Sequence, residues 1–317
     1  MLKKITDLNI NHNTIMKRRT FIKNIGASSL LMGVGGLSLS MKPSNAKQIT
    51  ILHTNDVHSH IDPFPITDPH NPNKGGIARR AYLIDQVRKE NPHTLLFDAG
   101  DIFQGTPYFN FYGGELEFKL MSMLKYDAAT LGNHDFDNGV EGLFAQLPHA
   151  KFDFIISNYD VSKTLLNGYT NPYKIYMVDG IKIGVFGLGV ELEGLVNKKQ
   201  YGETVYLNPI EIAQDMERKL YNEEHCDLIL CLSHLGYDYK NSPKVSDLKV
   251  AAQTSYIDLI IGGHTHTFLP RPTLVTNKRG NTTLVNQVGC YGINLGRVDF
   301  FFEKDSLVKN KAVTIEV

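Results

Sequence analysis

The sequence contains no tryptophan and only three cysteines, Cys226, Cys231 and Cys290, among 317 residues. A small, odd number of cysteines excludes a disulfide framework, and a chain of this length can bury an apolar core without one.

An excess of positive charge is also absent. Residues 1–46 hold seven of the 33 basic and one of the 33 acidic residues, which leaves 26 basic and 32 acidic residues, a net charge of −6, in the remainder. We therefore expect no nucleic-acid polymer among the partners, because such proteins carry a basic surface.

The first 46 residues have the composition of an export signal. The pair Arg18-Arg19 precedes residues 24–41, which carry no charge, and small residues at 44–46 offer a cleavage site before Lys47. This arrangement resembles a twin-arginine signal peptide. The alternative is a membrane anchor, but glycines and serines interrupt the apolar run that an anchor needs. We expect residues 1–46 to be removed on export, leaving a periplasmic protein with no stable membrane insertion, whether translation begins at Met1 or Met16.

Five short apolar runs in the remaining chain each end in a polar cluster. Such runs, bounded by glycine and polar residues, are typical of buried strands. The runs are 49–52, 94–97, 128–131, 228–232 and 257–261, and the clusters are Asp56-Val57-His58, Gly100-Asp101, Gly132-Asn133-His134-Asp135, Ser233-His234 and Gly263-His264-Thr265-His266. Ligands of open α/β sheets bind beyond the carboxyl ends of the strands, so the clusters should meet. Carboxylates, imidazoles and an amide suit divalent metals, and the sequence therefore predicts a metal site.

Further patterns predict a single α/β domain over residues 47–317. Apolar spacing indicates helices after Gly75-Gly76, over 115–124, over 140–147, and from Pro209 with Asn208 as its cap. The pair Asp179-Gly180 between two apolar runs predicts a hairpin of 175–178 and 181–186. Other strands are expected at 152–157, 283–288, 297–302 and 312–317. Parallel units together with hairpins imply two stacked mixed sheets with helices outside.

The five clusters, in this order, resemble those of the calcineurin-like metallophosphoesterases. Three segments, Ile51-Leu52-His53-Thr54-Asn55-Asp56, Gly100-Asp101-Ile102-Phe103-Gln104-Gly105 and Gly132-Asn133-His134-Asp135-Phe136-Asp137, look like the bacterial 5′-nucleotidase branch. Each motif alone is weak, but five in order after five strands are specific. The resemblance covers about residues 49–303. It implies a four-layer α-β-β-α sandwich of two mixed sheets flanked by helices.

The resemblance also implies roles for individual residues. Asp56, His58 and His266 would hold one divalent metal, Asn133, His234 and His264 would hold a second, and Asp101 would bridge them. The metals could be Mn, Zn, Fe or Co, because mixed nitrogen and oxygen ligands accommodate all four. A metal pair makes a hydroxide from water near neutral pH, and this hydroxide would attack phosphorus in line. His134 would act on the leaving-group side, held by Asp137, while Asp135 is interpreted as a supporting residue.

The implied function is release of phosphate from nucleoside 5′-monophosphates or related nucleotides. The same centre would also serve a 2′,3′-cyclic-nucleotide phosphodiesterase, a nucleotide-sugar hydrolase or a thiosulfohydrolase, and these alternatives stay open. A second class, a metal-binding recognition subunit without catalysis, would be expected to lack a ligand or His134. The chain stops at Val317, where the metallophosphatase domain should end. We therefore expect the family's C-terminal substrate-binding domain to be absent, so that a separate polypeptide supplies it or this domain acts alone.

Overall fold

The computed structural model describes residues 46–304 and 306–317. The expected signal peptide, apart from Ala46, lies outside the described residues. No helix in the described part of the chain is long and apolar enough to cross a lipid bilayer.

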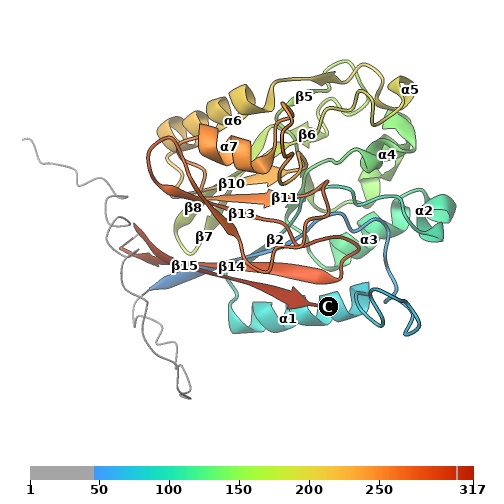
Figure 1. Cartoon of the computed structure of the whole chain (residues 1–317), viewed down its shortest axis with the longest axis horizontal. Coiled ribbons are helices and arrows are strands. Elements are labelled where there is room, and N and C mark those ends of the chain that lie inside the picture. Colours follow the sequence, from blue (N-terminus) through green and yellow to red (C-terminus); the bar gives the residue numbers. More distant parts are fainter. Residues whose placement is uncertain (1–45, 305) are drawn as a thin grey trace, which may run out of the picture.

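Two large mixed sheets form the centre of the molecule (Figure 1). The seven-stranded sheet has the order β15-β14-β1-β2-β3-β4-β6, and the six-stranded sheet has the order β12-β13-β11-β10-β8-β7. The strands of the first are β1 (Lys47–Thr54), β2 (Thr94–Asp98), β3 (Ala128–Ala129), β4 (Asp153–Ile155), β6 (Thr170–Asn171), β14 (Asn294–Glu303) and β15 (Ser306–Glu316). Those of the second are β7 (Tyr173–Val178), β8 (Ile181–Leu188), β10 (Leu228–Ser233), β11 (Leu259–Gly262), β12 (Thr273–Thr276) and β13 (Thr282–Asn286). A small pair, β5 (Tyr159–Asp160) and β9 (Val205–Tyr206), stands apart from both.

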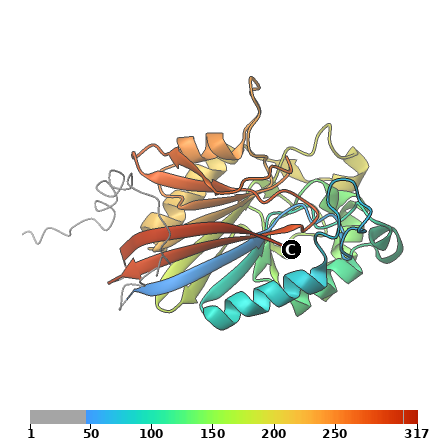
Figure 2. The same ribbon diagram turned by 60° about the horizontal axis from the view of Figure 1, so that its bottom comes forward.

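Helices cover the outer face of each sheet. The helices α1, α3 and α4 share one apolar cluster with Leu52, Leu96 and Phe154 of the seven-stranded sheet, and α6 and α7 share another with Phe186, Ile229 and Ile260 of the six-stranded sheet. Figure 1 shows α1 on one side of the two sheets and α6 and α7 on the other, and Figure 2 turns the α1 side toward the reader. The helices are α1 (Ile77–Glu90), α2 (Pro107–Tyr112), α3 (Glu115–Met123), α4 (Gly139–Gln146), α5 (Lys198–Tyr201), α6 (Pro209–Arg218) and α7 (Asp247–Gln253).

A third apolar cluster fills the space between the sheets. The alternation of side chains along each strand builds it. In β10, Leu228, Leu230 and Leu232 face this inner layer, whereas Ile229 and Cys231 face the outer helices. A strand that is buried on both faces needs an unbroken apolar run, which is why the sequence pattern locates these strands. The layers run helix, sheet, sheet, helix, so the expected four-layer sandwich is confirmed.

Several local predictions are also confirmed. Asn208 caps α6, since its side-chain oxygen accepts a hydrogen bond from the amide of Ile210 at 3.0 Å. Asp179 and Gly180, with φ of 51° and 77°, join β7 to β8 as a tight hairpin.

Other element boundaries differ from those expected. The strand predicted at 128–131 is paired only at Ala128–Ala129, because the chain turns off the sheet to bring Asn133 to its edge. The strand expected from residue 257 begins at Leu259, and that expected over 283–288 ends at Asn286. The sequence did not indicate β5, β6, β9, β12, α2, α5 or α7, most of which are too short to show a period.

Candidate metal centre

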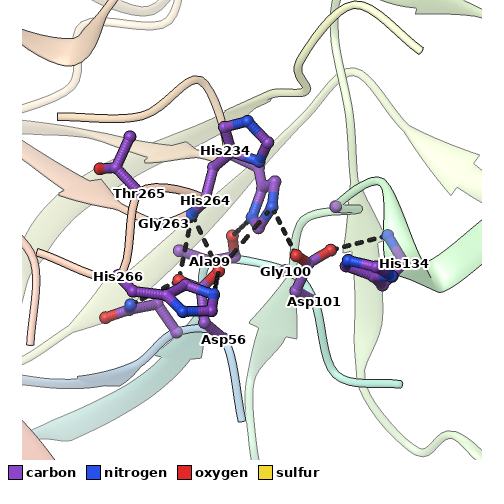
Figure 3. Close-up of polar contacts among 12 residues, drawn as sticks. Asp56, Ala99, Gly100, Asp101, His134, His234, Gly263, His264, Thr265 and His266 are labelled. Carbon is purple, nitrogen blue, oxygen red and sulfur yellow. Dashed lines mark hydrogen bonds and ion pairs between the residues drawn. The ribbon is translucent and has the colours of Figure 1, made fainter. Parts of the chain in front are cut away.

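All seven predicted ligands lie at one edge of the sandwich, where strands of both sheets end. Asp56 and His58 follow β1, Asp101 follows β2, and Asn133 follows β3, all in the seven-stranded sheet. The other three come from the six-stranded sheet: His234 follows β10, and His264 and His266 follow β11. Figure 3 shows Asp56, Asp101, His234, His264 and His266 around a common space.

The side chains form two groups that could each hold a metal ion. The first is Asp56, His58 and His266, and the second is Asp101, His234 and His264. In each group the candidate ligand atoms all lie within 4.8 Å of one another. The groups adjoin, since Asp101 Oδ2 lies 3.1 Å from His234 Nε2 and 3.7 Å from His58 Nε2. The Asp101 carboxylate is therefore within reach of both groups, as a shared ligand must be.

The hydrogen bonding of the candidate ligands fits a metal pair. Asn133 Oδ1 is buried and makes no hydrogen bond, although a buried polar atom normally has a partner. His234 Nε2 is also buried, and it lies 3.1 Å from Asp101 Oδ2. The opposite ring nitrogens of two histidines are already occupied. His234 Nδ1 lies 2.7 Å from the carbonyl of Ala99, and His58 Nδ1 lies 3.2 Å from that of Phe103. Donation to these carbonyls would turn each Nε2 toward the other candidate ligands, the arrangement usual for metal-binding histidines. His58 Nε2 lies 3.0 Å from His266 Nε2, and a cation could take the place of this contact.

The charges around the centre also favour bound divalent cations. A hydrogen bond with Asp56, together with Cys290, raises the pKa of His266 to about 10. Burial lowers the pKa of His234, but the carboxylates of Asp101 and Asp56 outweigh it and raise that pKa to about 10. Burial and then the neighbouring His234 lower the pKa of His264 to about 4. Two buried carboxylates thus create a negative potential that draws protons onto histidines, and divalent cations would satisfy the same potential.

The backbone at the ligands is strained. Asp56, His58, Asp101, His264 and His266 all have positive φ, between 49° and 73°. Non-glycine residues rarely adopt this conformation, and each such residue costs about 1–3 kcal/mol. Five of them in one cluster indicate that the loops are held in place by the surrounding structure and not by local preference.

His134 lies at the rim of the centre, in a 3₁₀ turn (His134–Phe136) directly after Asn133. Its Nδ1 lies 2.9 Å from Asp137 Oδ2, and this hydrogen bond is the main cause that raises the pKa of His134. Its amide donates to Asp101 Oδ1 at 2.8 Å, and its ring centroid is 5.2 Å from that of His58. About a third of its side chain is exposed. His134 is therefore oriented by a carboxylate and accessible to a molecule bound at the centre.

Asp135 points away from this space and holds the surrounding backbone. Its carboxylate accepts hydrogen bonds of 2.8–3.2 Å from the amides of Gly132, Asp101, Ile102 and Phe103. These bonds join the loop after β2 to the loop after β3, as a supporting residue should.

Two supporting residues were missed by the sequence analysis. Asn55 donates to Asp56 Oδ2 and to the carbonyl of Gly289, both at 2.6 Å. Gln287, fully buried, donates to the carbonyl of Gly263 and accepts from the hydroxyl of Thr265 at 3.0 Å and from the amide of Thr267. Gln287 thus binds the loop that carries His264 and His266. Gln287 lies just beyond the end of β13, a position that could have indicated a site residue. The sequence analysis did not single it out, because it placed residue 287 inside the predicted strand 283–288.

The sequence and the fold are similar to those of known phosphoesterases and nucleotidases. The family model for calcineurin-like phosphoesterases matches residues 49–268. The chain is 33% identical over 302 residues to the trifunctional nucleotide phosphoesterase protein YfkN of Bacillus subtilis. The match covers 85% of this chain and 19% of that protein. It is 34% identical over 285 residues to the snake venom 5′-nucleotidase of Crotalus adamanteus, with coverage of 83% of the chain and 47% of the relative. A solved 5′-nucleotidase precursor from Thermus thermophilus is similar with a TM-score of 0.77 at 34% identity, over 85% of this chain and 54% of that one. The chain spans about half the length, or less, of these relatives.

Proposed function

Because the chain belongs to the calcineurin-like phosphoesterase family, we propose that it is a two-metal phosphoester hydrolase that releases phosphate from nucleoside 5′-monophosphates or related nucleotides. One observation carries the proposal: carboxylates and imidazoles from both sheets converge around Asp101, with Asn133 Oδ1 buried and unpartnered beside them. The names of the relatives, a nucleotide phosphoesterase and two 5′-nucleotidases, support the nucleotide as substrate.

In this proposal the chain provides two sets of ligands. Asp56, His58 and His266 would hold one divalent ion, and Asn133, His234 and His264 would hold the other. Asp101 would contact both, because its carboxylate adjoins both groups. When bound, such a pair supplies an activated water for attack and neutralises charge on the phosphate oxygens.

His134 would assist departure of the leaving group. Its Nδ1 faces Asp137, so the other ring nitrogen is the one that can meet a substrate. The carboxylate of Asp137 fixes the ring orientation and favours the protonated form, which can donate to the leaving oxygen. A neutral alcohol such as a nucleoside would then depart from the phosphate.

Replacement of Asp101 tests the proposal. Asp101→Ala should lose both metals, measured by elemental analysis of purified protein, together with hydrolysis of a chromogenic phosphate ester. Asp160→Ala, a change at an exposed aspartate that belongs to neither ligand group, is the matched control and should retain both. Hydrolysis by Asp101→Ala at the wild-type rate would refute the proposal.

A substrate panel separates the alternatives that share one centre. Nucleoside 5′-monophosphates, 2′,3′-cyclic nucleotides, nucleotide-sugars and a thiosulfonate substrate should be compared at equal concentrations, and the monophosphates should give the highest kcat/KM. The panel should be repeated with any co-purifying polypeptide, since a separate base-binding chain would raise kcat/KM for nucleotides only.

Export through the twin-arginine pathway forms part of the proposal. The paired Arg18-Arg19 and the uncharged segment after it support this location. Replacement of both arginines by lysine should keep the full-length protein in the cytoplasm, measured by immunoblots of cell fractions. Unchanged recovery from the periplasm would exclude this route.

A further inference from the structure

Three aromatic side chains lie beside the first ligand group and have no role in the proposal so far. The ring centroid of Tyr291 is 5.9 Å from that of His58 and 5.8 Å from that of His266. The ring of His60 lies 4.3 Å from that of Tyr291 and 5.1 Å from that of Phe64, and the rings of Phe64 and Tyr291 are 5.9 Å apart. Tyr291, His60 and Phe64 are called the aromatic triangle below. The triangle contacts the candidate metal centre directly, through the rings of two predicted ligands.

The aromatic triangle is not part of the core. Its three side chains are half-buried, and none of them is a member of the apolar clusters that the described residues form. They come from two loops: His60 and Phe64 lie between β1 and α1, and Tyr291 lies between β13 and β14. Binding residues are often carried by loops that a rigid scaffold positions. Core packing therefore does not account for these three rings.

A pair of glycines brings the two loops together. Gly75 and Gly76 have φ of 77° and 98°, a conformation that favours glycine. A Cβ atom added to Gly76 would lie 3.0 Å from Pro63 of the first loop, and one added to Gly75 would lie 3.6 Å from the carbonyl of Tyr291 in the second. The chain at this pair thus lies in close contact with both loops. The absence of side chains here allows the triangle to assemble.

Tyr291 is held in a strained backbone conformation. Its φ is 62°, which is uncommon for a bulky residue. Its amide donates a 2.7 Å hydrogen bond to the carbonyl of Asp56, and the buried guanidinium of Arg80 packs so closely against Gly292 that a Cβ atom there would collide with it. Strain that the surrounding structure maintains in this way is a reason to look for a function.

The ring of His58 connects the triangle to His134. Its centroid lies 5.2 Å from that of His134 and 5.9 Å from that of Tyr291. In the proposed reaction His134 meets the leaving oxygen, which is the oxygen at which the nucleoside begins. Only a few bonds of the ribose separate that oxygen from the base. The base would therefore be within reach of an aromatic surface that adjoins the same imidazole.

The chemistry of the triangle suits a base better than a phosphate. Bases stack on aromatic side chains through their π-faces, whichever substituents they carry. The phosphate, in contrast, would be held by the cations. Aromatic rings beside the cation ligands would thus distinguish a nucleotide from a phosphate ester that has no base.

We propose that the aromatic triangle binds the base of the nucleotide, so that this chain contributes to substrate selection by itself. The inference rests on the proposed function, because it assigns the part of the substrate that the metal centre does not hold. The competing explanation is that the rings only orient His58 and His266. That explanation requires metal affinity to change when a ring is removed, so the two can be separated.

Phe64→Leu is the most informative variant, because among the described residues Phe64 makes ring contacts with His60 and Tyr291 and with no predicted ligand. We expect KM for adenosine 5′-monophosphate to rise about fivefold or more, with kcat/KM for glycerol 2-phosphate within about twofold of wild type. Tyr291→Leu should raise the same KM about 10- to 100-fold, whereas Tyr291→Phe keeps the ring and should stay near wild type. Phe144→Leu is the matched control, since Phe144 is also half-buried and its ring contact is with Tyr169.

Metal affinity should be measured on the same proteins by competition with a chromogenic chelator, and it should not change. Wild-type KM for the nucleotide in both Phe64→Leu and Tyr291→Leu would overturn the proposal. Equal loss of both esters together with weaker metal binding would also overturn it, because the rings would then only orient the ligands.

Equilibrium dialysis of adenosine against metal-loaded protein keeps this result separate from the proposed function. Wild-type protein should bind adenosine, and Tyr291→Leu should bind it at least about tenfold more weakly. If the wild-type protein hydrolyses neither ester, the proposed function fails, whereas equal adenosine binding by the two proteins overturns the role of the triangle.

Discussion

The buried amide of Gln287 offers a sharp test of how the ligand loops are held. This side chain belongs to neither ligand group, yet it forms hydrogen bonds with Gly263, Thr265 and Thr267, which flank His264 and His266. Gln287→Leu keeps the volume and removes every one of these bonds. Gln287→Glu keeps an oxygen for Thr265 and Thr267, and in the protonated form that burial favours it also keeps a donor for the Gly263 carbonyl.

The expected magnitude follows from the number of bonds lost. A buried polar group left without a partner costs about 1–3 kcal/mol. Gly263 is fully enclosed, whereas Thr265 and Thr267 are half-buried and can recruit water. We therefore expect Gln287→Leu to lower the free energy of unfolding by about 3 kcal/mol, and Gln287→Glu by less. Loss of a residue that orients metal ligands weakens metal affinity about 10- to 100-fold, which is about 1.4–2.7 kcal/mol.

Metal affinity and stability should be measured separately on the same proteins. Competition with a chromogenic chelator gives the two dissociation constants, and urea denaturation of metal-free protein gives the free energy of unfolding. The control is Gln214→Leu, because Gln214 makes one hydrogen bond from a half-buried position, to the carbonyl of Gln253. Rescue of metal affinity in Gln287→Glu relative to Gln287→Leu would show orientation of the loop and not only lost stability. If Gln287→Leu binds two metals with wild-type affinity, the loop does not depend on this amide and the reasoning is wrong.

Three other changes test further parts of the structure. His134→Ala should lower kcat about 10²- to 10⁴-fold with metal content unchanged, because the ring belongs to neither ligand group; loss of metal on elemental analysis would contradict this role. Burial raises the pKa of Asp247 to about 8 from 3.8, so the folded protein holds a proton that the unfolded chain releases. Stability should therefore decline as pH rises from about 4 to 8, by at most about 5 kcal/mol, and Asp247→Asn should flatten this decline in urea titrations; an unchanged slope counts against the assignment. Chelation of the metals should lower the melting temperature, since a ligand at 1,000 times its Kd adds about 4 kcal/mol, and calorimetry with and without added metal measures it; an identical melting temperature in both would argue against a bound pair.

The sequence was sufficient to predict the layers because each central strand is buried on both sides. Leu228–Ser233 has no polar position before Ser233, so its burial could be inferred without knowledge of its neighbours. The polar clusters could be placed at one edge for the same reason, since parallel strands put their carboxyl ends together. These two inferences located the candidate centre, although the role of each ligand stays a prediction.

The remaining features depend on contacts between distant segments. Gln287 and Asn55 acquire their function from loops more than twenty and two hundred residues away, respectively, and no local pattern reveals such a pairing. Short pieces such as β5 and β9 form because Tyr159 and Tyr206 meet across the chain, not because two residues have a period.

The ligands are divided between two sheets that pack against each other through an apolar layer. Stacked sheets lie about 10 Å apart, a spacing set by the side chains between them. Those side chains, among them Phe97, Leu230 and Ile261, therefore act as the spacer that determines how far Asp101 sits from His234. A change of volume in this hidden layer would alter the fit of a cation pair from within. Substitutions in this buried layer should therefore disturb the metal centre strongly, although these residues contact neither solvent nor substrate.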